Sequence, residues 1–239
     1  MRGETVPSID VSDVSFSYRT LLRKKQVFDG FCLNIDGGVC CLLGHNGAGK
    51  TTLLKLIYGV LKPSQGAIAV HMTRMDGMAL VTGPWGVEER LSSRENLRFR
   101  EKYLGNSDVV AQGERWARRM GIAGYMDTPC RELSSGLFVR AALVLALSES
   151  PEVLLLDEPT AAVDPETRVV VAQAAAEMAD VGSAVVVATH DFDLAHKVGR
   201  RAVVLDEGSL VDGFPLAECS RDELESRYFA TVRHVGEGS

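Results

Sequence analysis

Hydrophobic and polar positions alternate through much of the N-terminal part of the chain. Hydrophobic side chains occupy every second position over residues 9–11, 14–18 and 31–35. A period of two predicts strands with one buried face. The phase changes at Ser12 and Asp13, which predicts a bulge or a turn within the first strand.

Later segments are continuously apolar over the length of a strand. They are residues 39–43, 153–156 and 184–188. Such runs are typical of strands buried on both faces of a parallel sheet. An Ala-rich helical pattern at residues 166–179 separates the last two runs. The pattern predicts a β-α-β unit and therefore an α/β fold.

The middle of the chain changes character. A further strand is expected at residues 67–70, with Asp76 and Gly77 as the turn of a hairpin leading into residues 78–82. Residues 88–126 are then rich in Arg and Glu and have a helical pattern. This composition indicates a solvated helical region inserted between parts of the sheet.

The C-terminal part reads as a hairpin followed by a helix. The apolar segments 202–205 and 209–211 flank the turn residues 206–208, which predicts a terminal hairpin. A charged helix is expected at about residues 221–233. The Gly-rich end is expected to be a disordered tail.

The composition of the chain limits the classes of protein to which it can belong. The chain has 239 residues, of which 46% are hydrophobic, and a formal net charge of −6. Charges interrupt each apolar run before the roughly 18–20 residues that cross a bilayer. The N-terminus lacks the apolar core of a signal peptide. We therefore expect a cytoplasmic chain, and its acidic balance gives no general attraction to nucleic acid.

The cysteines indicate neither a disulfide framework nor a zinc site. There are five, an odd number, and none are in C-x-x-C spacing. We expect most of them to be small core residues, with one or two exposed thiols.

The segment after the first continuous apolar run carries the strongest chemical signal. Residues 44–51 read Gly-His-Asn-Gly-Ala-Gly-Lys-Thr and precede an amphipathic helix. The glycines permit a turn whose N–H groups face a phosphate, Lys50 can bridge the β- and γ-phosphates, and Thr51 can ligate Mg²⁺. The helix dipole favours the same anion. A purely structural glycine turn is the alternative, but the flanking strand and helix favour a site for ATP or GTP.

Two acids, Asp157 and Glu158, follow the apolar run at 153–156. The carboxyl ends of strands are where open α/β sheets bind ligands. The hypothesis is that Asp157 lies near Mg²⁺, through its water shell, and that Glu158 is the base that orients the attacking water. The alternative is that the two acids cap a helix.

Residues 133–137, Leu-Ser-Ser-Gly-Leu, precede another helical pattern. Ser134 or Ser135 can simply be the N-cap of that helix. The functional alternative is a second anion site, made of a serine hydroxyl, the amide of Gly136 and the helix N-terminus. Two phosphate sites in one chain indicate that each serves a different nucleotide.

Taken in order, these motifs resemble those of the nucleotide-binding subunit of an ATP-binding cassette (ABC) transporter. Residues 44–51 match the Walker A loop, residues 133–137 match the signature, usually LSGGQ, and residues 153–158 match Walker B. Tyr18 matches the aromatic residue that stacks on adenine, residues 161–164 resemble the D-loop, His190 matches the switch histidine, and Arg140 matches the arginine that follows the signature. The resemblance covers nearly the whole chain.

The resemblance implies the following roles. The nucleotide would be bound by Tyr18, Gly44, His45, Asn46, Gly47, Ala48, Gly49, Lys50, Thr51 and Thr52. The catalytic residues would be Glu158 and His190, and Mg²⁺ would be held by Thr51 and, through water, Asp157. Ser134, Ser135 and Gly136 would contact the ATP of a partner cassette, and Asp164 would belong to the D-loop.

The resemblance also implies a fold and partners. The fold would be a P-loop NTPase core with a RecA-like sheet, an antiparallel β subdomain and an inserted helical subdomain. One domain, residues 1–239, would comprise a core at 1–79 and 151–213, a helical subdomain at 80–150, and a C-terminal helix and tail at 214–239. Two cassettes, identical or paralogous, would close head to tail over ATP and drive a separate membrane subunit from its cytoplasmic face.

The sequence departs from the family pattern in two places. No glutamine lies near Gly83, Pro84 and Trp85, where the family has one that contacts Mg²⁺ or water and faces the membrane partner. Glu88 or Glu89 is a candidate substitute. Trp85 is expected to anchor the membrane partner, and the alternative is that it packs within the helical subdomain.

In the signature, Ser135 replaces a glycine and Leu137 replaces the glutamine, whereas Ser134 and Gly136 keep the hydroxyl and the amide that a phosphate needs. We expect ATP hydrolysis to power transport through a membrane subunit, with export favoured by the Ala-rich motifs and the missing glutamine. A soluble ABC ATPase acting on ribosomes, DNA or iron–sulfur assembly is the alternative, disfavoured by the short chain and its acidic charge. A GTPase or small-molecule kinase is disfavoured because no Asn/Thr-Lys-x-Asp motif is present.

Overall fold

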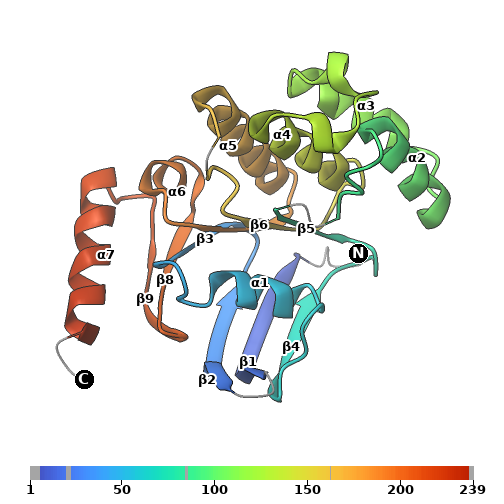
Figure 1. The fold of residues 1–239 in the computed structure, drawn as a ribbon. Coiled ribbons are helices and arrows are strands. Elements are labelled where there is room, and N and C mark those ends of the chain that lie inside the picture. Colours follow the sequence, from blue (N-terminus) through green and yellow to red (C-terminus); the bar gives the residue numbers. More distant parts are fainter. Residues whose placement is uncertain (1–5, 20–22, 84–85, 162, 237–239) are drawn as a thin grey trace, which may run out of the picture.

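The computed structural model describes residues 6–19, 23–83, 86–161 and 163–236, and they form two β-sheets with helices around them (Figure 1). The smaller sheet is antiparallel, in the order β2-β1-β4, and consists of β1 (Ser8–Arg19), β2 (Lys24–Ile35) and β4 (Gln65–His71). The register of β1 on β2 shifts between Val11 and Val14, and Asp13 has a φ of +52°. The predicted bulge in the first strand is therefore confirmed.

The larger sheet has the order β5-β6-β7-β3-β8-β9. Its strands are β3 (Gly38–Leu43), β5 (Met78–Thr82), β6 (Val153–Asp157), β7 (Ala184–Thr189), β8 (Arg201–Asp206) and β9 (Ser209–Pro215). Neighbouring strands from β5 to β8 are parallel, and β9 returns antiparallel to β8. Both the predicted β-α-β unit and the predicted terminal hairpin are confirmed.

The hairpin predicted around Asp76 and Gly77 is wrong. The strand before this turn, β4, belongs to the smaller sheet, whereas β5 pairs in parallel with β6 in the larger one. The turn is held against the start of β6, because the Gly77 carbonyl accepts the N–H groups of Glu152 and Val153 at 2.7 and 2.9 Å. Burial of the apolar residues of β5 against the core decides its partner, and the local turn residues do not.

Helices cover both faces of the larger sheet. They are α1 (Lys50–Ile57), α2 (Ser93–Leu104), α3 (Val109–Arg119), α4 (Ser135–Leu147), α5 (Pro165–Asp180), α6 (Phe192–Val198) and α7 (Arg221–Gly236), with 3₁₀ turns at Ala123–Tyr125 and Cys130–Glu132. Figure 1 shows α1 between the two sheets and α2 to α5 on the opposite side of the larger sheet. No helix in the described part of the chain is long and apolar enough to cross a membrane.

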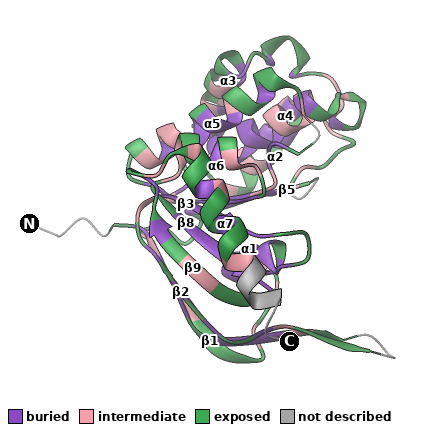
Figure 2. Ribbon diagram, turned by 90° about the vertical axis from the view of Figure 1, so that its left-hand side faces the viewer, coloured by how far each residue is buried: buried purple, intermediate pink, exposed green. Residues whose placement is uncertain are grey.

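The larger sheet is buried on both sides, which explains its continuous apolar strands. In β3, Cys40 and Leu42 pack in the cluster with α1 and the smaller sheet, whereas Cys41 and Leu43 pack in the cluster with the helices above. Figure 2 shows the buried positions running through these strands, with exposed positions on outer helices such as α3. All five cysteines are free, and burial raises the pKa of the Cys40 thiol to about 12.

Candidate functional site

The phosphate loop joins β3 to α1 by a backbone that only glycine adopts easily. Gly49 is the N-cap of α1 with a φ of +111°, and a Cβ on it would lie 2.9 Å from the Phe28 ring. No side chain among the described residues caps the first turn of α1. Its N–H groups are thus left to a ligand, and the helix dipole favours an anion there.

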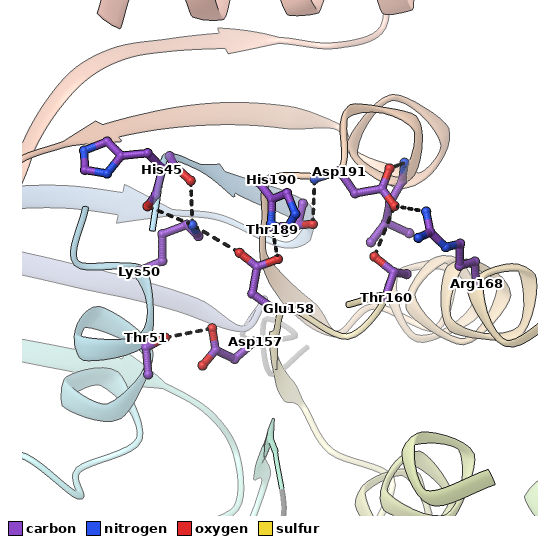
Figure 3. Close-up of polar contacts among 12 residues, drawn as sticks. His45, Lys50, Thr51, Asp157, Glu158, Thr160, Arg168, Thr189, His190 and Asp191 are labelled. Carbon is purple, nitrogen blue, oxygen red and sulfur yellow. Dashed lines mark hydrogen bonds and ion pairs between the residues drawn. The ribbon is translucent and has the colours of Figure 1, made fainter. Parts of the chain in front are cut away.

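Lys50 lies beneath this loop, with only 5% of its surface exposed. Its ammonium donates to the carbonyls of Gly44 and His45 at 2.5 and 3.2 Å, and it lies 3.1 Å from Glu158 Oε1 (Figure 3). A buried ammonium in this position has its charge balanced by one carboxylate. It is therefore placed to contact an anion bound by the loop.

Glu158 connects the ends of two strands. Its φ is +47°, and its N–H donates to the Ala188 carbonyl of β7 at 2.8 Å. Oε2 lies 2.8 Å from His190 Nδ1. The other oxygen, Oε1, is buried without a hydrogen-bond partner among the described residues, apart from its ion pair with Lys50. The Lys50 ammonium therefore balances the charge on Oε1, and this oxygen can accept a hydrogen bond from water once that ammonium turns to a bound anion.

Asp157 lies beside the start of α1. Its Oδ1 accepts a hydrogen bond from Thr51 Oγ1 at 3.1 Å (Figure 3). Oδ2 accepts one from Thr82 Oγ1 at 2.7 Å. Hydroxyl and carboxylate oxygens are ligands that Mg²⁺ accepts, usually together with water and substrate phosphates. The pair Thr51 and Asp157 therefore fits a Mg²⁺ held mainly by a bound nucleotide.

The segment after β7 is held by Asp191. The Asp191 carboxylate accepts the Leu194 N–H at 3.0 Å and so caps α6. It also accepts bonds from Thr160 Oγ1 at 3.2 Å and from the Arg168 guanidinium at 3.1 Å (Figure 3). This network fixes the backbone next to His190, whose own side chain is 62% exposed.

A pocket of about 610 Å³ opens beside the phosphate loop. It is lined by Tyr18, Lys25, Gln26, Val27, His45, Asn46, Gly47, Gly49, Lys50, Thr51, Thr52, Glu158, Glu207 and Gly208. The structure thus brings together most of the predicted nucleotide-binding residues. Tyr18 is 41% exposed, and its hydroxyl lies 3.3 Å from Thr52 Oγ1.

Three of the loop residues that were predicted to bind the nucleotide mainly support the loop itself. Gly44 and Ala48 lie behind the loop: Ala48 is fully buried, and a Cβ on Gly44 would lie 2.6 Å from the Leu205 carbonyl. His45 lines the pocket but braces the loop, since its Nε2 lies 2.9 Å from Asp206 Oδ1. These residues shape the loop more than they face its contents.

Sequence reasoning missed several lining residues, including Lys25, Gln26 and Glu207. Lys25 pairs with Tyr18 across β1 and β2, so the register of that hairpin could have indicated it. Glu207 lies in the turn between β8 and β9, with a φ of +43°. No local motif marks this turn as part of the pocket.

The signature segment lies apart from this pocket. Ser134 caps α4 by accepting the Leu137 N–H at 3.3 Å, so the N-cap interpretation is confirmed. A Cβ on Gly136 would lie 2.3 Å from Asp164 Oδ2, which only glycine permits. Ser134, Ser135 and Gly136 are not among the residues that line the pocket of their own chain.

Asp164 connects the signature helix to α5. It caps α5 by accepting the Thr167 N–H at 2.8 Å, and this backbone bond is the main cause that lowers the pKa of Asp164. Arg140 of α4 donates to Thr167 Oγ1 at 3.0 Å and to Asp164 Oδ1 at 3.3 Å. Signature and D-loop segments therefore form one polar cluster.

The region of the missing glutamine is only partly described, since Pro84 and Trp85 lie outside the described residues. The expected anchoring role of Trp85 stays a prediction. Glu88 accepts the Arg90 N–H at 3.3 Å, and its own N–H donates to Asn96 at 2.9 Å. Neither Glu88 nor Glu89 lines the pocket, and Thr82 is the residue of this region that reaches Asp157.

Comparison with protein families matches residues 31–161 of the chain to the ABC transporter family. The match spans more than half of the 239 residues, so the chain belongs to this family. It is an ATP-binding subunit of the ABC type, an ATPase, as the motifs predicted.

Individual relatives agree with this assignment. An ABC transporter ATP-binding protein of Archaeoglobus fulgidus is 32% identical over 85% of this chain and 73% of its own. The methionine import ATP-binding protein of Xanthomonas euvesicatoria is 31% identical over 84% of this chain and 65% of its own. The Nod factor export ATP-binding protein I of Rhizobium meliloti is 30% identical over 90% and 67%.

Solved structures show the same fold. An ATP-binding subunit of an ABC transporter has a TM-score of 0.79 at 22% identity, covering 92% of this chain and 99% of that one. A dimeric bacterial ABC transporter cassette has a TM-score of 0.76 at 22% identity, covering 87% and 98%. The predicted P-loop NTPase fold is therefore confirmed.

Proposed function

We propose that the pocket beside the phosphate loop binds MgATP and that Glu158 directs water at the γ-phosphate. The observation that carries this proposal is that two side chains, Lys50 and His190, both contact the Glu158 carboxylate. The Lys50 ammonium lies 3.1 Å from Glu158 Oε1, and His190 Nδ1 lies 2.8 Å from Oε2. Lys50 is the first residue of α1, whose N-terminus favours phosphate.

The chain's own groups divide the binding of ATP among them. The Tyr18 ring is partly exposed on the pocket and can stack on the base. The N–H groups from Gly47 to Thr52 surround the β-phosphate. Lys50, which now bonds to two loop carbonyls, can turn its ammonium to the β- and γ-phosphates with little movement.

Mg²⁺, when bound, neutralises charge on the phosphate oxygens and orders them for in-line attack. Thr51 and Asp157 are the residues that would hold it, Asp157 through water. Their side-chain oxygens lie 3.1 Å apart at the end of β6 and the start of α1.

Glu158 accepts the proton of the attacking water as the oxygen of that water bonds to the γ-phosphorus. The bond from the γ-phosphorus to the β–γ bridging oxygen breaks, and ADP leaves with that oxygen. In this proposal His190, with Nδ1 2.8 Å from Oε2, holds that oxygen, and Oε1 becomes the acceptor for the water once Lys50 turns to the phosphates. Lys50 balances the developing negative charge.

A second cassette completes the site in this proposal. Ser134 and Ser135 are exposed, and the α4 N-terminus lies outside the chain's own pocket. A head-to-tail partner, a second copy or a paralogue, would bring this N-terminus to the γ-phosphate. Asp164, bonded to Arg140 beside it, would lie in the same interface.

We further propose that the dimer drives a separate membrane subunit from its cytoplasmic face. The chain carries the ATPase, and the relatives are named for transport. In this proposal residues 80–150, which hold α2 to α4, form the helical subdomain, and residues 1–79 and 151–213 form the core. The export direction expected from the sequence gains no support from the relatives, whose names include import of methionine and export of Nod factor.

The proposal is tested with Glu158→Gln, which removes the base and keeps the shape. Hydrolysis of MgATP should fall by about 10²-fold or more. ATP binding should persist. A dimer that depends on ATP should accumulate, and light scattering should detect it. Glu218→Gln is the matched control, because Glu218 is exposed and lies outside the pocket.

Hydrolysis at the wild-type rate by Glu158→Gln would contradict the assignment. The transport function is tested separately by co-purification from detergent-solubilised membranes. Recovery of the chain with ribosomes or DNA, and without a membrane protein, would instead favour a soluble ABC ATPase.

A further inference from the structure

The last residue of β5 contacts the site from a position that no motif predicted. Thr82 pairs with Asp157 in the parallel register of β5 and β6. Its hydroxyl donates to Asp157 Oδ2 at 2.7 Å, while Thr51 donates to Oδ1 at 3.1 Å. The Asp157 carboxylate is therefore held by two threonine hydroxyls, one from α1 and one from β5.

We propose that Thr82 is a positioning residue for the Mg²⁺ of this site. Its hydroxyl holds the Asp157 carboxylate in the rotation that turns Oδ1 toward Thr51. Asp157 is only partly buried, and the terminal torsion of an Asp side chain has broad minima when nothing fixes it. A hydrogen bond to the second oxygen of a carboxylate that binds a metal, directly or through water, removes this freedom. The inference rests on the proposed MgATP site.

The strand itself does not require a hydroxyl at residue 82. The rest of β5 is Met-Ala-Leu-Val, an apolar run, and valine has the same branched shape and strand preference as threonine. Thr82 is half-buried at the strand end, where its hydroxyl has the Asp157 carboxylate within reach. The hydrogen bond to Asp157 is thus the structural reason for a hydroxyl at residue 82.

The contact also bears on the missing glutamine. The sequence has no glutamine from residue 80 to residue 91. Glu88 is the nearest acid in the sequence, and its carboxylate accepts the Arg90 N–H while its own N–H donates to Asn96 Oδ1 of α2. Thr82 therefore supplies a direct polar link from the end of β5 to the proposed Mg²⁺ site.

The test compares Thr82→Val, which removes the hydroxyl, with Thr82→Ser, which keeps it. Binding of ATP to the full chain is measured by calorimetry, first in EDTA and then against increasing MgCl₂. Thr82→Val should need about 10-fold more Mg²⁺ for its half-maximal effect on ATP binding, the scale of a lost outer-shell partner. Its affinity for ATP in EDTA should be unchanged, and Thr82→Ser should behave as the wild type.

The outcomes separate this inference from the proposed function. An unchanged Mg²⁺ requirement in Thr82→Val overturns the positioning role while the site stands. A loss of affinity in EDTA together with a lower melting temperature overturns it as well, because the residue is then structural. If the wild type itself binds ATP without any response to Mg²⁺, the proposed MgATP site fails and this inference fails with it.

Discussion

Glu158 and His190, from the ends of neighbouring strands, meet with His190 Nδ1 2.8 Å from Glu158 Oε2. Glu158 has a φ of +47°, a region that non-glycine residues rarely adopt. The bond from its N–H to the Ala188 carbonyl ties this strained residue to β7. Backbone strain of this kind persists only where the surrounding structure holds it. Strained residues are concentrated at functional sites.

This contact predicts the effect of His190→Ala. The turnover number should fall by about 10²-fold, because Glu158 loses the donor that orients its carboxylate. ATP affinity should change little, since His190 contacts Glu158 and not the phosphate loop. Steady-state hydrolysis and equilibrium binding measure the two effects. His196→Ala on α6 is the matched control, and equal turnover in both variants would contradict the role.

Lys50→Ala is expected to weaken ATP binding by about 2–3 kcal/mol, the scale of a lost charge-assisted contact to phosphate. The substitution also leaves Glu158 without its buried counter-ion. Calorimetric titration with ATP measures the affinity. Lys55→Ala, in the last turn of the same helix, should bind as the wild type. Similar affinities in the two variants would remove Lys50 from the binding site.

Tyr18→Ala is expected to weaken binding by about 1 kcal/mol through lost stacking. Tyr18→Phe keeps the ring and loses only the 3.3 Å contact between the hydroxyl and Thr52, so it should bind nearly as the wild type. Because stacking does not read the base edge, ATP and GTP should be affected alike. A large defect in Tyr18→Phe would show that the hydroxyl, and not the ring, matters.

The lowered pKa of Asp164 predicts that the stability of the folded chain depends on pH. The Thr167 N–H holds the pKa of Asp164 below its usual range, so the folded state favours the ionised form. This contribution is present at neutral pH and is lost as the pH falls from the unfolded value of about 3.9 through the lower folded one.

Asp164→Asn keeps a capping side chain without the charge. It should therefore be less stable than the wild type at pH 7, and the difference should shrink below about pH 4. Urea unfolding across this range measures it. A difference that stays constant with pH would mean that the charge of Asp164 does not contribute.

The sequence predicts best what is local. Residues 44–51 and the two acids at the end of β6 are contiguous motifs whose chemistry follows from residue type and spacing, and the structure places Lys50 and Glu158 in contact. Continuous apolar runs likewise identify the strands of the larger sheet. Only the order of the strands, and not their existence, required the structure.

What the sequence does not show depends on register and on the choice of sheet. Asp76 and Gly77 form a turn, but no local signal says that β4 and β5 belong to different sheets. Thr82 ends an apolar strand and matches no motif. It becomes relevant only because the register of β5 on β6 sets it opposite Asp157.

The opposite packing of Cys40 and Cys41 has a consequence for how the molecule can move. The larger sheet separates two clusters of buried side chains. One cluster includes α1 and the smaller sheet, and the other includes α4 and α5. A movement of α4 or α5 therefore reaches the phosphate loop through the strands of the sheet, because the side chains beneath the loop lie in the other cluster. The strands that carry such a movement end at the carboxyl edge where Lys50, Asp157 and Glu158 lie together.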